Sequence, residues 1–419
     1  MGRKPASDEK SDRYLARVGP GLIAGASDDD PSAIATFTIA GATFGTRMLW
    51  TPLVTWPLMA AAQMMCARVG MITGRGIIGA LRMKFPRPLL IAFAALLFVT
   101  NMLNIGADLS GMAEAAEMLT GVPSPAFVLL FGGAIAAGTV RLRYEHLAQI
   151  LKWLAVALVA YPIAAFLLRP DWGAILRTSL VPQLPASRRE WTLLIGIIGT
   201  TFSPYFLMWQ ASHEVEEKKQ VRDHDELPGA RTGDVRFRAF DVGVGTFFSR
   251  IVMFFIILTS ALTLHRDRVT ITSARQAAEA LGPLSGEAAK LLYTAGLLSV
   301  GFLVIPVLSG SAAYALAEAV GWKQGLDEKL RYARKFYAVL ILCTAGGMAL
   351  ELTPIQPMQA LVWSGVINGF LAPCLLLGVL LVATDTRIMR GRASPRWERW
   401  IVALTIVAML ACTVMFFVP

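Results

Sequence analysis

Long apolar runs separated by short polar stretches dominate this chain of 419 residues. Each run has roughly the 20 residues that a helix needs to cross a bilayer. We expect eleven membrane spans, over residues 18–41, 48–71, 88–110, 124–140, 147–168, 191–215, 239–263, 291–318, 335–350, 357–383 and 400–418. The pattern therefore predicts an all-α polytopic membrane protein.

Polar residues and a proline interrupt two of these spans. The first span contains Asp30-Pro31-Ser32-Ala33, and the sixth contains Thr200-Thr201-Phe202-Ser203-Pro204-Tyr205. Proline removes a backbone donor and disfavours helical geometry in the residue before it, so both helices are expected to break. Interrupted helices at corresponding positions of two halves indicate an inverted repeat with an ion site between the halves.

The repeat divides the chain into four parts. We expect a cytoplasmic tail over 1–17, a first five-helix repeat over 18–168, a second over 191–383 and a last helix over 400–418. Lys and Arg gather in the tail and in alternate loops, which the positive-inside rule assigns to the cytoplasm. The N-terminus is then cytoplasmic, the C-terminus extracytoplasmic, and the plasma (inner) membrane is the expected location.

Composition agrees with this architecture. Hydrophobic residues make up 55% of the chain and charged residues only 16%, against about 25% in soluble domains. The net charge of +10 follows from the basic loops and needs no nucleic acid. No nucleotide-binding or hydrolase motif is present, and the four cysteines have no metal or redox spacing. We expect no enzyme activity, no cofactor and no obligatory protein partner.

Two connecting loops are unusually charged. Residues 386–392 carry three arginines and form a basic edge suited to anionic lipid headgroups; alternatively, they only fix the topology. Residues 216–238 mix both signs and are expected to form a solvated, mobile loop.

The aspartates of the first span are the strongest candidate site residues. Charge at membrane depth is costly and indicates function. Beside the break, Asp30 suits a hard cation such as Mg²⁺, Ca²⁺ or Mn²⁺, the alternative being a structural cap. Successive helical residues are about 100° apart, so Asp28 and Asp29 are expected to line the vestibule instead. Ser27, about one turn earlier, offers a hydroxyl or a carbonyl.

Further oxygen ligands are expected from other spans. Thr200, Thr201 and Ser203 supply hydroxyls and carbonyls at the second break, unless they only bond back to their own helix. In the tenth span, Asn368 is suited either to a hydrated ion or to linking helices.

Two more acidic residues are candidates for an ion pathway. Asp108 in the third span is a pathway or gating residue, or else it pairs with a buried base such as Arg250. Glu214, at the end of the sixth span, lines the inner vestibule or belongs to a solvated helix end.

These motifs resemble the Nramp family of divalent metal transporters. The similar segments are residues 19–25 and 30–36 in the first span, 199–205 in the sixth, and 277–291 before the eighth. The resemblance covers nearly the whole chain. It implies the LeuT-type fold, with eleven helices, two inverted five-helix repeats, and broken helices one and six.

Departures from the family pattern concentrate at the breaks. By resemblance, Asp30 matches the family's metal-binding aspartate. Ala33 stands where the family has an asparagine ligand, and Ser203 where it has a methionine ligand. Tyr205 replaces a histidine linked to proton transfer, which makes it a candidate pathway position.

Other departures lie in spans three and ten. Asp108 matches a family aspartate, but Gly111 stands where an acidic partner is expected. Gly365 stands near the family's glutamine, with Asn368 one turn away.

These departures indicate a different ion. Losing the thioether removes the soft ligand that rewards Mn²⁺ or Fe²⁺, and Mg²⁺ prefers to keep its waters. The pattern resembles the Nramp-related magnesium transporters, which implies alternating-access transport of Mg²⁺ and Mn²⁺ without proton coupling. The alternatives are a proton-coupled Mn²⁺/Fe²⁺ transporter and, remotely, a Mg²⁺-dependent membrane enzyme of the prenyltransferase type.

Overall fold

The computed structural model describes residues 30–141, 156–221, 232–265, 271–281, 286–326, 330–353 and 355–417, and this part of the chain contains helices and no strands. The helices of the first half are α3 (Pro31–Phe44), η1 (Gly45–Met48), α4 (Trp50–Thr73), α5 (Ile77–Leu81), α6 (Arg87–Thr120), α7 (Ser124–Arg141), η2 (Val156–Val159), α9 (Ala160–Leu167) and α10 (Trp172–Leu180). Those of the second half are α11 (Arg188–Thr201), α12 (Pro204–Val221), α13 (Thr232–Thr263), α14 (Ala274–Ala278), η3 (Glu279–Leu281), α15 (Gly286–Val320), α16 (Arg334–Ala349), η4 (Leu350–Leu352), α17 (Pro357–Ala383) and α18 (Arg396–Phe417).

Every predicted span corresponds to a helix. Seven helices in the described segments are long and apolar enough to cross a membrane, counting α11 and α12 as one. The other predicted spans correspond to α3, α4, α9 and α16, and the beginnings of the first and fifth spans lie outside the described residues. The prediction of an all-α polytopic membrane protein is confirmed.

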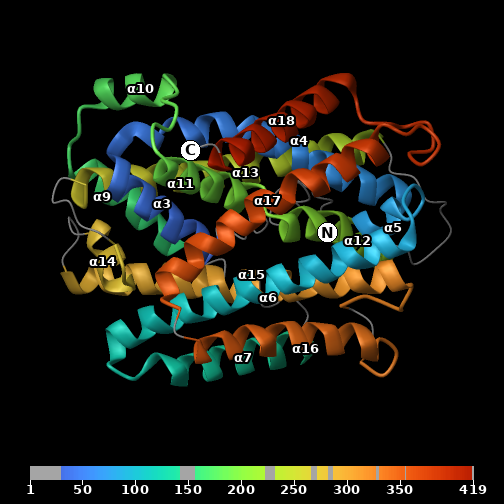
Figure 1. Cartoon of the computed structure of the whole chain (residues 1–419), viewed down its shortest axis with the longest axis horizontal. Coiled ribbons are helices and arrows are strands. Elements are labelled where there is room, and N and C mark those ends of the chain that lie inside the picture. Colours follow the sequence, from blue (N-terminus) through green and yellow to red (C-terminus); the bar gives the residue numbers. More distant parts are fainter. Residues whose placement is uncertain are drawn as a thin grey trace, which may run out of the picture.

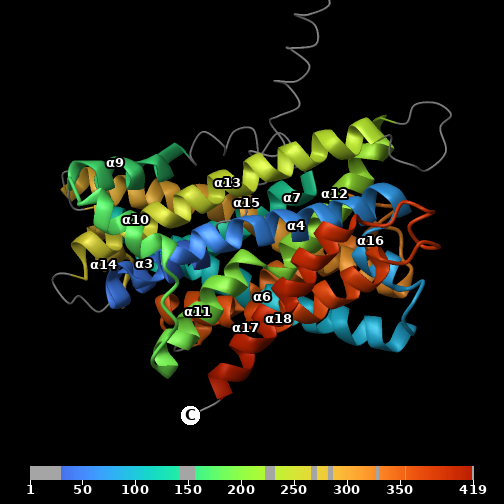
Figure 2. The same cartoon turned by 90° about the horizontal axis from the view of Figure 1, so that it is seen from above.

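The long helices run roughly parallel to one another (Figure 1). α7 and α16 lie together at one edge, and α6 and α15 form the next row, in contact with both. The helices beside the predicted breaks, α3 and α11, lie on the other side of α6. α3 packs against α13, and α11 packs against α17. Turned by 90°, the molecule shows α17 and α18 together along one edge (Figure 2). The helix breaks therefore lie among packed helices, away from the surface.

The second predicted break is seen in full, and at the first the structure shows the start of the helix that follows it. α3 begins at Pro31, with Asp30 as its extended N-cap residue (ψ 169°) and its side chain accepting from the Ala33 amide. A proline at the first helical position and an aspartate cap are typical of helix starts. α11 ends at Thr201, and α12 begins at Pro204 after a two-residue interruption at Phe202 and Ser203.

Glycines allow α11, the helix that ends at the second break, to approach α17 closely. A Cβ built on Gly199 would collide with the Gly365 carbonyl oxygen and with the backbone of Gly369. Gly365 and Gly369 form a GxxxG pair, which lets helix backbones meet in a membrane. This contact fixes the end of α11, and hence the second break, against α17.

The loop expected over 216–238 is wrong at both ends, and its middle, residues 222–231, lies outside the described residues. α12 continues to Val221 and α13 begins at Thr232, so both ends of the expected mobile loop are helical. Arg238 is buried and paired, as described below. A second difference is α10, an amphipathic helix capped by Asp171 in the connection after the fifth span. Hydropathy alone does not detect either feature, because ion pairs and caps stabilise them.

Candidate functional site

Asp30 lies at the N-terminus of α3 and is completely buried. Its Oδ1 accepts hydrogen bonds from the Ser32 hydroxyl and the Ala33 amide, both at 2.6 Å. Its Oδ2 accepts from the Tyr205 hydroxyl at 3.0 Å. Because Tyr205 belongs to the first turn of α12, this last bond joins the two breaks directly. The Asp30 carboxylate therefore caps the N-terminus of α3, as the alternative of a structural cap predicts. It also contacts Tyr205 at the second break.

The hydroxyls at the second break bond back to their own helix. Ser203 Oγ donates to the carbonyls of Gly199 (3.1 Å) and Thr200 (2.8 Å), and Thr200 Oγ1 donates to Ile197 (3.0 Å). Both side chains are buried. A hydroxyl that donates one hydrogen bond still has oxygen lone pairs to offer. Back-bonding therefore orients these oxygens and leaves them able to accept a water or a cation.

Thr201 has a different environment. Its Oγ1 accepts a hydrogen bond from Arg250 Nη1 at 2.7 Å, and Arg250 Nη2 donates to Ser249 Oγ at 2.8 Å. A guanidinium at this distance opposes a second cation on the same oxygen. Thr201 thus positions Arg250, which comes from α13.

A polar stripe on α6 faces α15 and α17 and, at Asp108, the start of α3. Asn101, Asn104 and Asp108 have the i, i+3, i+7 spacing of one helix face, and all three are completely buried. Asn101 Nδ2 donates to Ser311 Oγ at 2.8 Å, and Asn104 Nδ2 donates to Asn368 Oδ1 of α17 at 3.3 Å. The amide oxygens of Asn101 and Asn104 and both carboxylate oxygens of Asp108 have no hydrogen-bond partner among the described residues. Buried acceptors of this kind can accept a hydrogen bond from a water or bind an ion.

Asp108 does not pair with Arg250, so that alternative is wrong. Its carboxylate lies close enough to Asp30 for the two charges to interact, and close to the Ser32 backbone. Arg250 instead contacts Thr201, Ser249 and the sulfur of Met253. The structure therefore brings two carboxylates together at the N-terminus of α3.

Glu214 is buried, so its interpretation as part of a solvated helix end is wrong. It accepts from Gln210 Nε2 at 3.0 Å and forms an ion pair with Arg238 Nε at 2.7 Å. Arg238 Nη1 also contacts Asp241 Oδ2 at 3.1 Å. This network ties the end of α12 to the start of α13.

The structure brings together most of the predicted residues. Asp30, Tyr205 and Asp108 meet at the start of α3, while Ser203 and Thr200 lie at the facing break. Asn368 joins through Asn104. The predictions for Ser27, Asp28 and Asp29 fall outside the described residues.

Sequence reasoning missed the contributions of several residues. Asn101 and Asn104 lie in an apolar span, and only their three-residue spacing from each other and four-residue spacing to Asp108 signals a polar face. Arg238 falls in the loop expected over 216–238, and Asp241 falls in the seventh predicted span. Their partnership with Glu214 joins two helices, so no local pattern in the sequence reveals it.

The possible ligands at this site are mostly oxygen atoms, and few of them are charged. No group of three or more His, Cys, Asp or Glu side chains able to hold a metal occurs among the residues the structure describes. A cation here would take its remaining ligands from hydroxyls, amides, carbonyls and water, which suit hard cations.

Comparison with known proteins places this geometry in a family. Residues 21–419 match the family model described as natural resistance-associated macrophage protein-like, Nramp. A divalent metal cation transporter, MntH, from Deinococcus radiodurans is 26% identical over 95% of this chain and 89% of its own length. The MntH of Burkholderia ambifaria is 27% identical over 94% and 87%.

Solved structures confirm the fold. The Eremococcus coleocola manganese transporter superposes with a TM-score of 0.77 at 17% identity, covering 99% of this chain and 88% of that one. The inward-facing conformation of Mhp1 gives a TM-score of 0.56 at 17% identity, covering 95% and 86%. Both are transporters of the LeuT type, so the LeuT-type fold predicted for this chain is confirmed. With a family model matched along nearly its entire length, the chain belongs to the Nramp family.

Proposed function

We propose that this protein moves a partly hydrated Mg²⁺, and also Mn²⁺, across the inner membrane by alternating access without proton coupling. The MntH relatives and the manganese transporter named above are transporters and not enzymes. A divalent metal is therefore its substrate and not a cofactor. One observation supports the choice of ion. The buried Asp30 carboxylate at the first break is hydrogen-bonded to Tyr205 at the second, and oxygen-bearing side chains surround it.

The side chains at the site favour an ion that keeps water. Ala33 offers no ligand atom and Ser203 offers only a short hydroxyl, so both leave room for waters that longer ligands would replace. Mg²⁺ prefers near-octahedral oxygen coordination and sheds water reluctantly. The unpartnered oxygens of Asn104 and Asp108 can accept hydrogen bonds from such waters.

The same residues argue against proton coupling. Tyr205 contacts Asp30 through a phenol, at the position where, by resemblance, the family has a histidine linked to proton transfer. Asn101 and Asn104 on the α6 stripe do not titrate. The alternative is a proton-coupled Mn²⁺ transporter, which the manganese transporter among the similar structures favours.

Within this proposal the residues divide into ligands and pathway. Asp30, Ser203 and Thr200 hold the ion with its waters, and Ser27 and Asn368 complete the oxygen set. Thr201 acts through Arg250. Asp28, Asp29, Asp108, Tyr205 and Glu214 lie along the pathway.

The proposed topology follows the charge distribution. The tail over 1–17 is cytoplasmic, the repeats over 18–168 and 191–383 move against each other, and the helix over 400–418 ends outside. We place the divalent cation and the bilayer as the only required partners.

Uptake into proteoliposomes tests the ion and the coupling together. Vesicles would contain a Mn²⁺-quenched dye in one arm and a pH-sensitive dye in the other. We expect external Mg²⁺ to compete with Mn²⁺ entry, and the internal pH to stay constant during uptake. Mn²⁺ entry that is insensitive to Mg²⁺, or that acidifies the lumen, would instead support the proton-coupled alternative.

A further inference from the structure

The connection between α17 and α18 is tightly folded although it is rich in arginine. Asp385 Oδ1 accepts from the amides of Arg387 (2.9 Å) and Ile388 (3.3 Å). Arg390 and Gly391 adopt positive φ angles of 49° and 76°, so the chain reverses there. Backbone bonds from Gly391 to Thr386 (2.7 Å) and from Ser394 to Ala383 (3.0 Å) close the loop. Its conformation is therefore fixed by its own backbone.

Buried side chains anchor this loop to the helices. Ile388 and Met389 are 7% and 0% exposed and point into the protein. Ser394 Oγ donates to Glu398 Oε1 at 3.2 Å, and Glu398 Oε2 pairs with Arg68 of α4 at 3.1 Å. With its apolar residues inside, the loop presents its arginines outwards.

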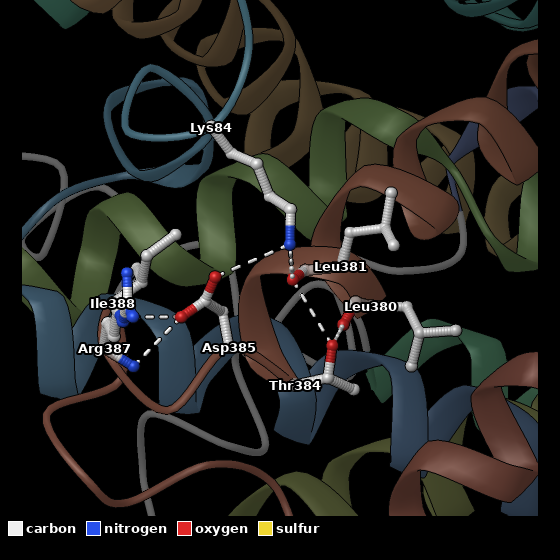
Figure 3. A network of polar contacts seen from close by, with 7 residues as sticks. All are labelled: Lys84, Leu380, Leu381, Thr384, Asp385, Arg387 and Ile388. Carbon is white, nitrogen blue, oxygen red and sulfur yellow. Dashed lines mark hydrogen bonds and ion pairs between the residues drawn. The ribbon is translucent and has the colours of Figure 1, made fainter.

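A second basic segment meets the loop. Lys84 Nζ, in the connection between α5 and α6, donates to the Leu381 carbonyl at 3.1 Å and lies 3.5 Å from Asp385 Oδ2 (Figure 3). We define the basic rim as the exposed side chains of Lys84, Arg387, Arg390, Arg392 and Arg396. Asp385 is a negative group in direct contact with this rim, and Glu398 is buried on Arg68. Among the described residues, Arg387 and Arg396 of the rim form no ion pair, so the rim carries positive charge.

The exposed face of α18 shows where the rim lies relative to a membrane. Large apolar side chains recur on this helix at a spacing typical of one face, and all are at least 45% exposed: Trp397, Trp400, Leu404, Val407, Leu410, Val414 and Phe417. Such a face suits lipid tails. Tryptophans gather where tails meet headgroups, and the two tryptophans stand at the end of the face next to the loop. The basic rim therefore lies at headgroup level.

We propose that the basic rim is a binding surface for the headgroups of anionic phospholipids, whose phosphates the arginines and Lys84 engage while the acyl chains lie along α18. Arginine binds phosphate oxygens through paired hydrogen bonds, and each basic residue near an anionic surface strengthens binding about fivefold. A topology signal alone would not require a loop folded by Asp385 and closed at Gly391. This proposal does not depend on which cation is transported.

Lipid binding to the purified protein tests the proposal. Native mass spectrometry and melting curves would compare phosphatidylglycerol with phosphatidylcholine of the same chains. We expect wild type to prefer phosphatidylglycerol and the triple variant R387Q/R390Q/R392Q to lose that preference, on the order of a hundredfold in affinity. The matched control R169Q/R177Q/R189Q removes three exposed arginines around α10, which lies far from the rim (Figure 1), and should behave as wild type.

Several outcomes would overturn the proposal. One is a wild-type protein that binds both lipids equally, and another is a triple variant that keeps the wild-type preference. Equal loss in the control variant would show that total charge matters and not the rim. Equal stabilisation by inorganic phosphate would show that lipid is not the occupant. If the triple variant does not fold, the single variant R387Q must lose about fivefold in affinity, and an unchanged affinity counts against the rim.

Discussion

Asp30 serves both as helix cap and as proposed cation ligand, and replacing it by asparagine separates the two roles. An asparagine Oδ1 can accept the same bonds from Ser32 and Ala33 that hold the start of α3, and asparagine caps helices as well as aspartate does. The substitution Asp30→Asn therefore removes the negative charge and keeps the cap.

The expected loss of affinity is large. A unit charge pair at 4 Å is worth about 4 kcal/mol at an effective dielectric constant of 20, so a divalent cation gains roughly twice that from the Asp30 carboxylate. Desolvation cancels part of this gain. If about half remains, Mg²⁺ binding falls by roughly a thousandfold, at about 1.4 kcal/mol for each factor of ten. Folding should not suffer, because a buried charge has been removed.

Calorimetric titration with Mg²⁺ and a melting curve of the ion-free protein measure the two effects separately. Asp30→Asn should lose binding and melt no lower than wild type. The control Asp30→Ala should lose binding and also about 0.5–2 kcal/mol of stability, because the cap is gone. An Asp30→Asn protein that binds Mg²⁺ within threefold of wild type would refute the assignment of Asp30 as the main ligand.

Three further predictions concern the second break, the helix contact beside it and the loop after α17. Ser203→Met adds a thioether at the site and should shift uptake towards Mn²⁺ over Mg²⁺ by about tenfold. Gly199→Ala should cost about 1–3 kcal/mol in the free energy of unfolding, because the new methyl group meets the Gly365 carbonyl. Backbone hydrogen bonds from Ile388 and Arg387, together with Lys84, hold the pKa of Asp385 below its ordinary value of 3.8. This carboxylate therefore stabilises the fold above pH 3.8, and the contribution disappears as the pH falls through the lower folded-state pKa. The acid-induced drop in melting temperature should be smaller in Asp385→Asn.

Each of these predictions has a contrary result. An unchanged Mg²⁺/Mn²⁺ ratio in Ser203→Met would show that this position does not set selectivity. Gly133→Ala is the control for Gly199→Ala, since nothing lies within 4 Å of its new methyl group; equal destabilisation of both would remove the packing argument. Wild-type acid sensitivity in Asp385→Asn would mean that other groups control the transition.

The helices and both breaks could be predicted from sequence because their causes are local. An apolar run of sufficient length, and a proline after Asp30 or Ser203, each act within a few residues. The close approach of α11 and α17 has weaker local evidence, since Gly199 and the pair at Gly365 and Gly369 are far apart in the chain.

The contacts of the site were less predictable. The charge of Asp30 and its position within an apolar span indicated a functional site. Its hydrogen bond from Tyr205 could not be predicted, because it depends on how two distant breaks face each other. Asp108 was assigned to an ion pathway or to a pair with Arg250, and the structure removes the second alternative. Glu214 appeared solvated because its partner Arg238 lies beyond a charged stretch.

Locating the ion tests the central claim most directly. Crystals grown with Mn²⁺ would be measured at the manganese absorption edge, with and without excess Mg²⁺. We predict one anomalous peak between Asp30 and Ser203, with waters completing the coordination and with its height reduced by Mg²⁺. A peak elsewhere, a site without waters, or a peak that Mg²⁺ does not diminish would contradict a hydrated magnesium site at the helix breaks.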